Sequence, residues 1–196
     1  GRYGVGSDAA VRPGRRESGE TVREGKSKQE VLFSSYLCHP SLANNELSGP
    51  LALSFLYKKI AALPNRRYTY RFAVMPETIG AICYLSKRGK HFKKNMVAGF
   101  QMTCVGDAGN FTYKRSRSGN SLADRAAGAV IKETGPHEIL RFDPSTGSDE
   151  RQYCSPGFDL PVGSLMRTMY GRYPEYHTSL DNKDFISFEA LNKSVE

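Results

Sequence analysis

Residues 148–182 run SDERQYCSPGFDLPVGSLMRTMYGRYPEYHTSLDN, and this segment decides how the chain is organised. Its apolar run at 160–165 has the length and composition of a buried β-strand. The acidic residues Asp149 and Glu150 precede this strand, and a loop that contains His177 follows it. Polar side chains grouped around the end of a buried strand are typical of functional sites in α/β proteins.

Upstream and downstream of this segment, strand-like and helix-like stretches alternate along the chain. Further strands are predicted at 31–38, 68–75, 97–105, 111–114 and 138–142. Helices are predicted at 48–63, 78–86, 121–133 and 188–195. The first of these helices has Ser48 as its expected N-cap and Pro50 in its first turn. The alternation predicts a three-layer α/β/α sandwich around a mixed, mostly parallel sheet.

The N-terminal residues differ in composition from the rest. Gly, Arg, Ser and Glu dominate residues 1–29, which show little hydrophobic periodicity. We expect this segment to be flexible or poorly packed, and residues 30–196 to form the α/β domain.

Several classes of protein are disfavoured by composition. No apolar run approaches the length of a membrane-spanning helix, and the chain starts at Gly1 without a basic-then-apolar leader. The four cysteines form no CxxC pair, so buried, reduced thiols and a cytoplasmic location are expected. They are Cys38, Cys83, Cys104 and Cys154.

The chain is basic, with 28 Lys and Arg against 20 Asp and Glu and a net charge of +8. Basic residues gather in three separate stretches, within 1–29, at 87–94 and at 114–117. No helix-turn-helix, zinc-finger or RNA-binding signature connects them, which favours solvated surface loops over a nucleic-acid interface.

Chemically reactive residues follow the predicted strands. His39, Glu77 and Asp107 each come just after a strand, and His177 follows the strand at 160–165. Because the carboxyl ends of parallel strands meet at one edge of a sheet, these side chains should lie together. Imidazole and carboxylate groups suit zinc. The alternatives are that the histidines merely close loops, and that Glu77 caps the next helix.

Other catalytic patterns are absent. The sequence contains no GxSxG elbow, no phosphate-binding loop, no GxGxxG and no HExxH motif. Cys38 beside His39 suggests a thiol nucleophile. However, neighbouring strand residues point to opposite faces, so we expect Cys38 to lie in the core.

Four motifs stand out in the sequence: SYLCHPSLANNELSGP (35–50), VMPETIGAICYLS (74–86), TCVGD (103–107) and the segment 148–182. Together they resemble the aminopeptidase-like domain proteins associated with bacterial polysaccharide biosynthesis. That family is similar in fold to di-zinc aminopeptidases of the leucyl aminopeptidase and glutamate carboxypeptidase type. The resemblance covers residues 30–196, and members usually extend further at both ends, so the chain is expected to be a fragment.

The resemblance implies a zinc-aminopeptidase-like fold and a set of site residues. His39 matches a metal ligand that follows the first core strand, and His177 matches the histidine of a YHT motif. Glu77 matches the general base, the first residue of a Glu-Glu pair in the relatives.

Three carboxylate ligands implied by the resemblance are missing. Asn45 stands at the bridging position, and Thr78 and Thr103 stand at two further ligand positions. Glu46 is a candidate substitute, and Asp107 or water are others. Because two zinc ions need a bridging carboxylate to offset their charge, we expect one ion at most, or none.

Two functions are open. The first is a metallohydrolase of peptide or amide bonds, with Glu77 as base and Tyr176 or Tyr153 stabilising the oxyanion. The second is a non-catalytic module that binds a peptide, an amino sugar or a protein. In either case we expect a small peptide-like or amino-sugar ligand, and neither a membrane nor nucleic acid. Asp149 and Glu150 are expected to line the pocket.

Overall fold

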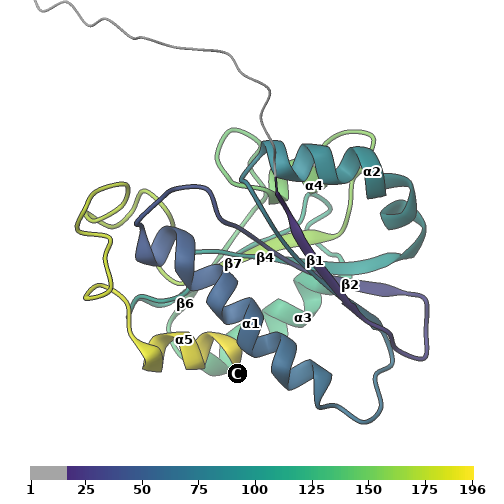
Figure 1. Cartoon of the computed structure of the whole chain (residues 1–196), viewed down its shortest axis with the longest axis horizontal. Coiled ribbons are helices and arrows are strands. Elements are labelled where there is room, and N and C mark those ends of the chain that lie inside the picture. The colour runs from purple at the N-terminus through teal and green to yellow at the C-terminus, as the bar shows by residue number, and fades with distance from the viewer. Residues whose placement is uncertain (1–16) are drawn as a thin grey trace, which may run out of the picture.

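The computed structural model describes residues 17–196, which form one mixed sheet between two layers of helices (Figure 1). The strands lie in the spatial order β1-β3-β2-β4-β7-β5-β6. In chain order they are β1 (Gly19–Arg23), β2 (Glu30–Tyr36), β3 (Thr69–Met75), β4 (Met96–Met102), β5 (Phe111–Lys114), β6 (His137–Leu140) and β7 (Val162–Met166).

Strand direction creates one functional edge. β2 pairs in parallel with β3 and β4, and β4 pairs in parallel with β7. β1 runs antiparallel to β3, and β5 runs antiparallel to β7. The carboxyl ends of β2, β3, β4 and β7 therefore share one edge, where parallel sheets place their binding sites.

Helices cover both faces of the sheet, as the alternation of elements predicts. On one face lie α1 (Ser48–Ala61), α3 (Leu122–Val130) and α5 (Phe188–Val195) (Figure 1). On the other lie α2 (Ile79–Asn95) and α4 (Glu150–Tyr153). Single turns precede α1 and follow α3, namely η1 (Ala43–Leu47) and η2 (Ile131–Thr134). The predicted α/β/α sandwich is confirmed.

The alternation of side chains along β2 shows how the two cores form. Leu32 is fully buried against α2, in a cluster with Tyr84 and Phe92. The next residue, Phe33, points to the opposite face, where its ring centroid lies 5.4 Å from that of Phe72. Each such apolar side chain contributes about 1.5–3 kcal/mol of burial free energy.

One strand lies where the sequence predicts a poorly packed segment. β1 pairs along its whole length with β3, and Glu20 makes an ion pair with Arg71 at 2.8 Å. The sequence GETVR contains few apolar residues, so hydrophobic periodicity does not reveal this strand. Backbone pairing with β3 holds it in place. The prediction for 1–29 is therefore wrong at 19–23, and its first sixteen residues lie outside the described part.

The start of α1 also differs from the expected cap. A π-helical turn, η1, leads directly into the helix, and Leu47 occupies the N-cap without a side-chain bond. The Ser48 hydroxyl instead donates to Asn44 O at 2.5 Å and accepts from Val105 N at 3.0 Å. Ser48 thus connects η1 to the end of β4, which brings the ANNEL turn to the functional edge.

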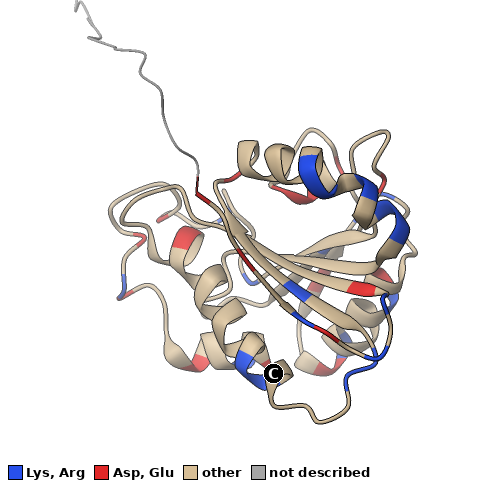
Figure 2. Ribbon diagram, turned by 45° about the vertical axis from the view of Figure 1, so that its right-hand side comes forward, with Lys and Arg blue, Asp and Glu red and all other residues tan. Residues whose placement is uncertain are grey.

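The basic stretch at 87–94 lies within α2, which is longer than predicted because Phe92 is buried beneath it. Figure 2 shows Lys and Arg residues along this helix and others on the sheet. In the described residues, no helix is both long and apolar enough to cross a membrane.

Candidate functional site

His39 is held by a buried carboxylate just after β2. Its Nδ1 lies 2.5 Å from Oε1 of Glu46, a residue that is only 1% exposed. The other oxygen of Glu46 accepts the backbone N–H of Cys38 at 2.5 Å. When Nδ1–H donates to a carboxylate, Nε2 keeps its lone pair, which is the arrangement common to metal-binding histidines. Glu46 therefore orients His39 and has no oxygen left uncommitted.

His177 approaches His39 from the other end of the chain. The two ring centroids are 5.0 Å apart, and Tyr176 stacks on His177 at 3.9 Å. Zn–N bonds are about 2.0–2.1 Å long, so one ion can reach both rings. Tyr176 accordingly lies beside the histidine pair.

The loop of His177 is fastened by a residue that the sequence analysis did not single out. Asp181 is fully buried and accepts the backbone N–H groups of Asn44 at 2.6 Å and Asn45 at 3.0 Å. It therefore joins the EYHTSLDN loop to η1. Its place four residues after His177, within the same motif, is the signal that could have identified it.

Glu77 follows β3 and is half-buried. The Ser148 hydroxyl donates to its carboxylate at 2.5 Å, and no side-chain hydrogen bond caps α2. The next residue, Thr78, has a φ of 60°, a backbone strain of about 1–3 kcal/mol for a non-glycine residue. Its N–H donates to Asp149 at 2.6 Å. Ser148 and Asp149 thus hold Glu77 in place, and only Asp149 was among the predicted residues.

Asp149 is a buried carboxyl group with a strongly raised pKa. It is fully buried, and its second oxygen has no hydrogen-bond partner among the described residues. Burial, together with the negative charges of Glu77 and Glu150, raises the pKa of Asp149 to about 7. The carboxyl group consequently titrates near neutral pH.

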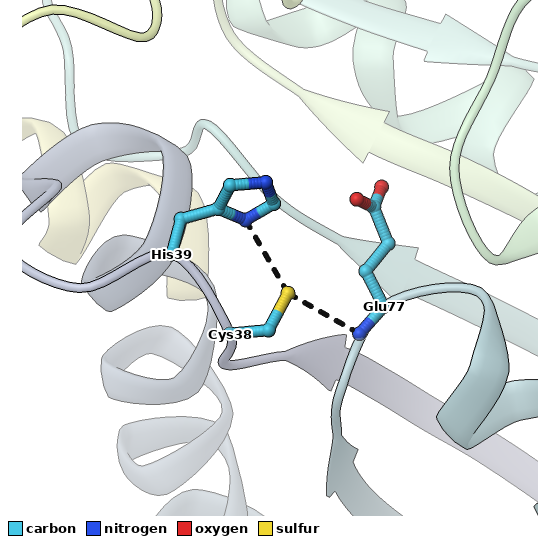
Figure 3. Close-up of side chains that lie close together, drawn as sticks. All are labelled: Cys38, His39 and Glu77. Atoms are coloured by element: carbon cyan, nitrogen blue, oxygen red, sulfur yellow. Dashed lines mark hydrogen bonds between the residues drawn. The ribbon is translucent and has the colours of Figure 1, made fainter. Parts of the chain in front are cut away.

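Cys38 does not lie in the core, contrary to the expectation from strand alternation. β2 ends at Tyr36, so the alternation stops before Cys38, which is exposed. Its sulfur lies 3.3 Å from Nδ1 of His39 and accepts the backbone N–H of Glu77 at 3.3 Å. Figure 3 shows the three side chains together, and their ligand atoms all lie within 4.8 Å of one another.

The thiol of Cys38 is protonated in the absence of a metal. Desolvation, together with the negative charges of Glu46 and Glu77, raises the pKa of Cys38 to about 11. A protonated thiol is a poor nucleophile.

Three predicted pocket residues have structural partners instead. Asp107 accepts hydrogen bonds from Asn44, Gly109 and Thr168. Glu150 forms a buried ion pair with Lys114 at 3.0 Å, and the hydroxyl of Tyr153 lies 3.1 Å from that of Ser34 in the core. These side chains are committed to the scaffold, because each buried polar group takes a nearby partner.

Two of the three positions without carboxylates, Asn45 and Thr103, share a hydrogen-bond network with Tyr36. The amide of Asn45 donates to Glu46 at 3.3 Å and accepts from the Tyr36 hydroxyl at 3.4 Å. The Thr103 hydroxyl lies 2.6 Å from that of Tyr36. Thr78 contributes its backbone to Asp149, as described above. Nitrogen, sulfur and a few oxygen donors suit one zinc ion better than a pair of metals bridged by carboxylates.

Comparison with known proteins places this site in context. A polysaccharide biosynthesis protein with an aminopeptidase-like domain from Clostridium acetobutylicum is 42% identical over 195 residues, which are 99% of this chain and 44% of the relative. The crystal structure of a peptidase from the same organism superposes with a TM-score of 0.86 at 41% identity, over 91% of this chain and 42% of that chain. This chain therefore spans less than half the length of these relatives.

A more distant structure extends the likeness in fold. The zinc aminopeptidase BSAP from Bacillus subtilis superposes with a TM-score of 0.74 at 15% identity, over 91% of this chain and 47% of that chain. Residues 9–196 match the family described as a domain of unknown function, DUF4910. The chain belongs to the DUF4910 family and has the α/β fold of the zinc aminopeptidases.

Proposed function

We propose that this chain is the catalytic part of a zinc-dependent hydrolase that cleaves a peptide or amide bond. The observation that carries the proposal is the approach of His39 and His177, with ring centroids 5.0 Å apart, at the sheet edge where Glu77 also lies. The zinc-aminopeptidase fold of the domain supports it.

In this reaction His39 and His177 hold the zinc ion, and Glu77 acts as the general base. Bound zinc polarises a carbonyl group and makes water more acidic. The Glu77 carboxylate takes a proton from the attacking water and delivers it to the leaving amine. Ser148 keeps that carboxylate oriented through its 2.5 Å hydrogen bond. The Tyr176 hydroxyl donates a hydrogen bond to the oxyanion.

The test is Glu77→Gln, assayed on a panel of aminoacyl amides and amino-sugar amides. Loss of a general base should lower the rate about 10²–10⁴-fold. Zinc content and melting temperature should stay unchanged, because the amide still accepts the Ser148 bond. Glu189→Gln, on the exposed face of α5, is the matched control and should retain full activity. A zinc-loaded Glu77→Gln protein with full activity would rule out this role.

A second function is favoured by the neutral residues Asn45, Thr78 and Thr103. A site with fewer anionic donors fits a module that binds a peptide-like or amino-sugar ligand without turning it over. The name of the Clostridium relative supports a role for such a module in polysaccharide biosynthesis. Zinc-loaded protein that binds amino-sugar amides and hydrolyses none of them would favour this function.

A further inference from the structure

We propose that a basic groove beside β6, the strand at one edge of the sheet, binds the diphosphate group of a small molecule. Three adjoining hollows of about 330, 470 and 470 Å³ form this groove. The first two share Arg115 and Ile139 in their lining, and the last two share Arg117 and Phe142. Each hollow has the size of a small-molecule site, which is about 300–1,000 Å³.

The lining of the basic groove is strongly positive. It contains a single carboxylate, that of Asp124, and several basic side chains from elements far apart in the sequence. A concave site lined by charges of one sign attracts ligands of the opposite sign. The basic residues are Arg115, Arg117, Arg125, Lys132, Arg141 and Arg151.

These cations are not neutralised by carboxylates of the protein. None of them forms an ion pair with an Asp or Glu within residues 17–196. The buried Nε of Arg151 finds no hydrogen-bond partner in the described part of the chain. Asp124 is directed to Ser116 and Ser121, from which it accepts hydrogen bonds at 2.6 and 2.8 Å. The groove therefore keeps a large excess of positive charge.

The loop that carries Arg115 and Arg117 is held in shape by hydrogen bonds of the protein itself. The guanidinium of Arg115 donates to Gly119 O at 2.8 Å. The backbone N–H and the hydroxyl of Ser116 both donate to Asp124, at 2.8 and 2.6 Å. Because the loop is ordered before binding, a ligand loses less free energy in ordering it.

The kind of cation indicates the kind of anion. All but one of the basic residues in the lining are arginines, and planar guanidinium groups bind the oxygens of carboxylates and phosphates in pairs. A single carboxylate has too few oxygens for several arginines, whereas two linked phosphoryl groups present charged oxygens in several directions. The ring of Phe142 lines two of the hollows beside these cations, where it can contact a base attached to the diphosphate.

A long polyanion fits the basic groove less well. Single-stranded nucleic acids are held by successive aromatic side chains along a basic path. Phe142 is the one aromatic residue among the lining residues, and the basic stretch at 87–94 lies on α2, outside the lining. The groove therefore favours a nucleoside diphosphate, and free pyrophosphate is the smaller ligand with the same chemistry.

The experiment is calorimetric titration of the wild-type chain with ADP, UDP and inorganic pyrophosphate at low ionic strength. The test variant combines Arg117→Gln with Arg141→Gln, two exposed residues of the groove. The matched control combines Lys26→Gln with Lys28→Gln, which removes the same charge from the exposed loop between β1 and β2. Circular dichroism checks that each variant folds.

We expect the wild type and the lysine variant to bind a nucleotide with equal affinity. The arginine variant should bind it at least about 10-fold more weakly, because one charge-assisted hydrogen bond corresponds to about that factor. The nucleotide should bind more tightly than pyrophosphate, and Phe142→Leu should remove this difference. Equal affinities of the wild type for nucleotide and pyrophosphate would keep the diphosphate site and identify free pyrophosphate as its ligand.

Several outcomes would overturn the inference, and the proposed hydrolase does not depend on them. No binding of any of these probes to the wild type, or equal affinity in the wild type and the arginine variant, would reject the groove as a diphosphate site. Binding of a single-stranded oligonucleotide without binding of any diphosphate would replace the ligand by nucleic acid. His39→Ala should bind the probes as the wild type does, and a loss of binding there would move the anion to the proposed metal site.

Discussion

Two buried aspartates, at opposite regions of the molecule, show how the scaffold differs from the site. Asp124 is 5% exposed and begins α3, where it accepts hydrogen bonds from Ser116, Ser121 and Tyr113 at 2.6–3.1 Å. Asp149 is 0% exposed at the functional edge, accepts one bond from Thr78, and leaves its second oxygen unpaired. Both side chains are buried, Asp149 more deeply, and the two also differ in how many hydrogen bonds they accept.

The pKa values of the two carboxyl groups shift in opposite directions. Burial alone would raise the pKa of Asp124, but hydrogen bonds from Ser116 and Ser121 bring it below its usual value. Burial raises the pKa of Asp149 to about 7, because few bonds oppose it and Glu77 adds negative charge. A buried carboxylate that accepts several hydrogen bonds stabilises the fold. A buried carboxylate with few hydrogen bonds lowers stability, and such groups are typical of functional sites.

The largest loss of unfolding free energy is expected for Asp124→Asn. Asparagine keeps one side-chain oxygen and replaces the other by an NH2 donor. The side chain can then no longer accept from both Ser116 and Ser121, and half of the capping box of α3 is put at risk. Loss of a cap together with an unsatisfied buried donor should cost about 2–4 kcal/mol of unfolding free energy. Urea denaturation measures it, and a cost below that of Asp149→Asn would contradict the comparison.

Asp149→Asn should change how stability depends on pH. The folded pKa of about 7 exceeds the unfolded value of about 3.9, so the folded state binds the extra proton between these values. Stability from this group is therefore present at low pH and is lost as pH rises towards 7, with about 2 kcal/mol at stake between pH 5 and 8.

The measurement is the unfolding free energy of metal-free protein at pH 5 and pH 8. Asp149→Asn should lose less stability over this interval than the wild type does. Asp124→Asn is the control, because the lowered pKa of Asp124 keeps it ionised in both conditions. Parallel curves for wild type and Asp149→Asn would show that Asp149 does not titrate in this range.

A smaller loss of stability is expected when either of the two neighbouring asparagines of η1 is replaced by aspartate. Asn45→Asp puts a second negative charge 3.3 Å from Glu46, beside His39. Asn44→Asp does the same beside Asp107, where the amide now donates at 2.9 Å, away from the histidines. Each should destabilise metal-free protein by about 1 kcal/mol or more through like-charge repulsion.

Zinc should separate these two variants. An added anionic donor near the ion should tighten binding by Asn45→Asp, and zinc should restore its melting temperature. Asn44→Asp should gain neither. Equal calorimetric affinities for Asn45→Asp and wild type would place residue 45 outside the reach of the metal.

The elements that the sequence predicts well are those with a strong apolar pattern. The helix at 188–195 lies where it was expected, the strand at 68–75 starts one residue later, and the strand at 31–38 is right except for its end, which lies at Tyr36. β1 escaped prediction because its stability comes from pairing with β3 and from Arg71, neither of which is local in sequence. Long-range partners of this kind leave no periodic signal.

The proximity of the candidate residues was predictable from the sequence, whereas the side chains that hold them were not. His39, His177 and Glu77 were placed at one edge by the rule for parallel strands, and the structure brings them together there. Cys38 was assigned to the core because the end of β2 at Tyr36 could not be located from the apolar run. Glu150 was expected in the pocket, but its charge is taken by Lys114, 36 positions away in sequence.

The most direct test of the whole account is the zinc content of freshly purified chain, alongside His39→Ala and His177→Ala. We expect one tightly bound zinc ion per wild-type chain, and its loss in both histidine variants while each remains folded by circular dichroism. Absence of zinc from the wild type after reconstitution, or full occupancy in either variant, would contradict a metal centre at this edge of the sheet.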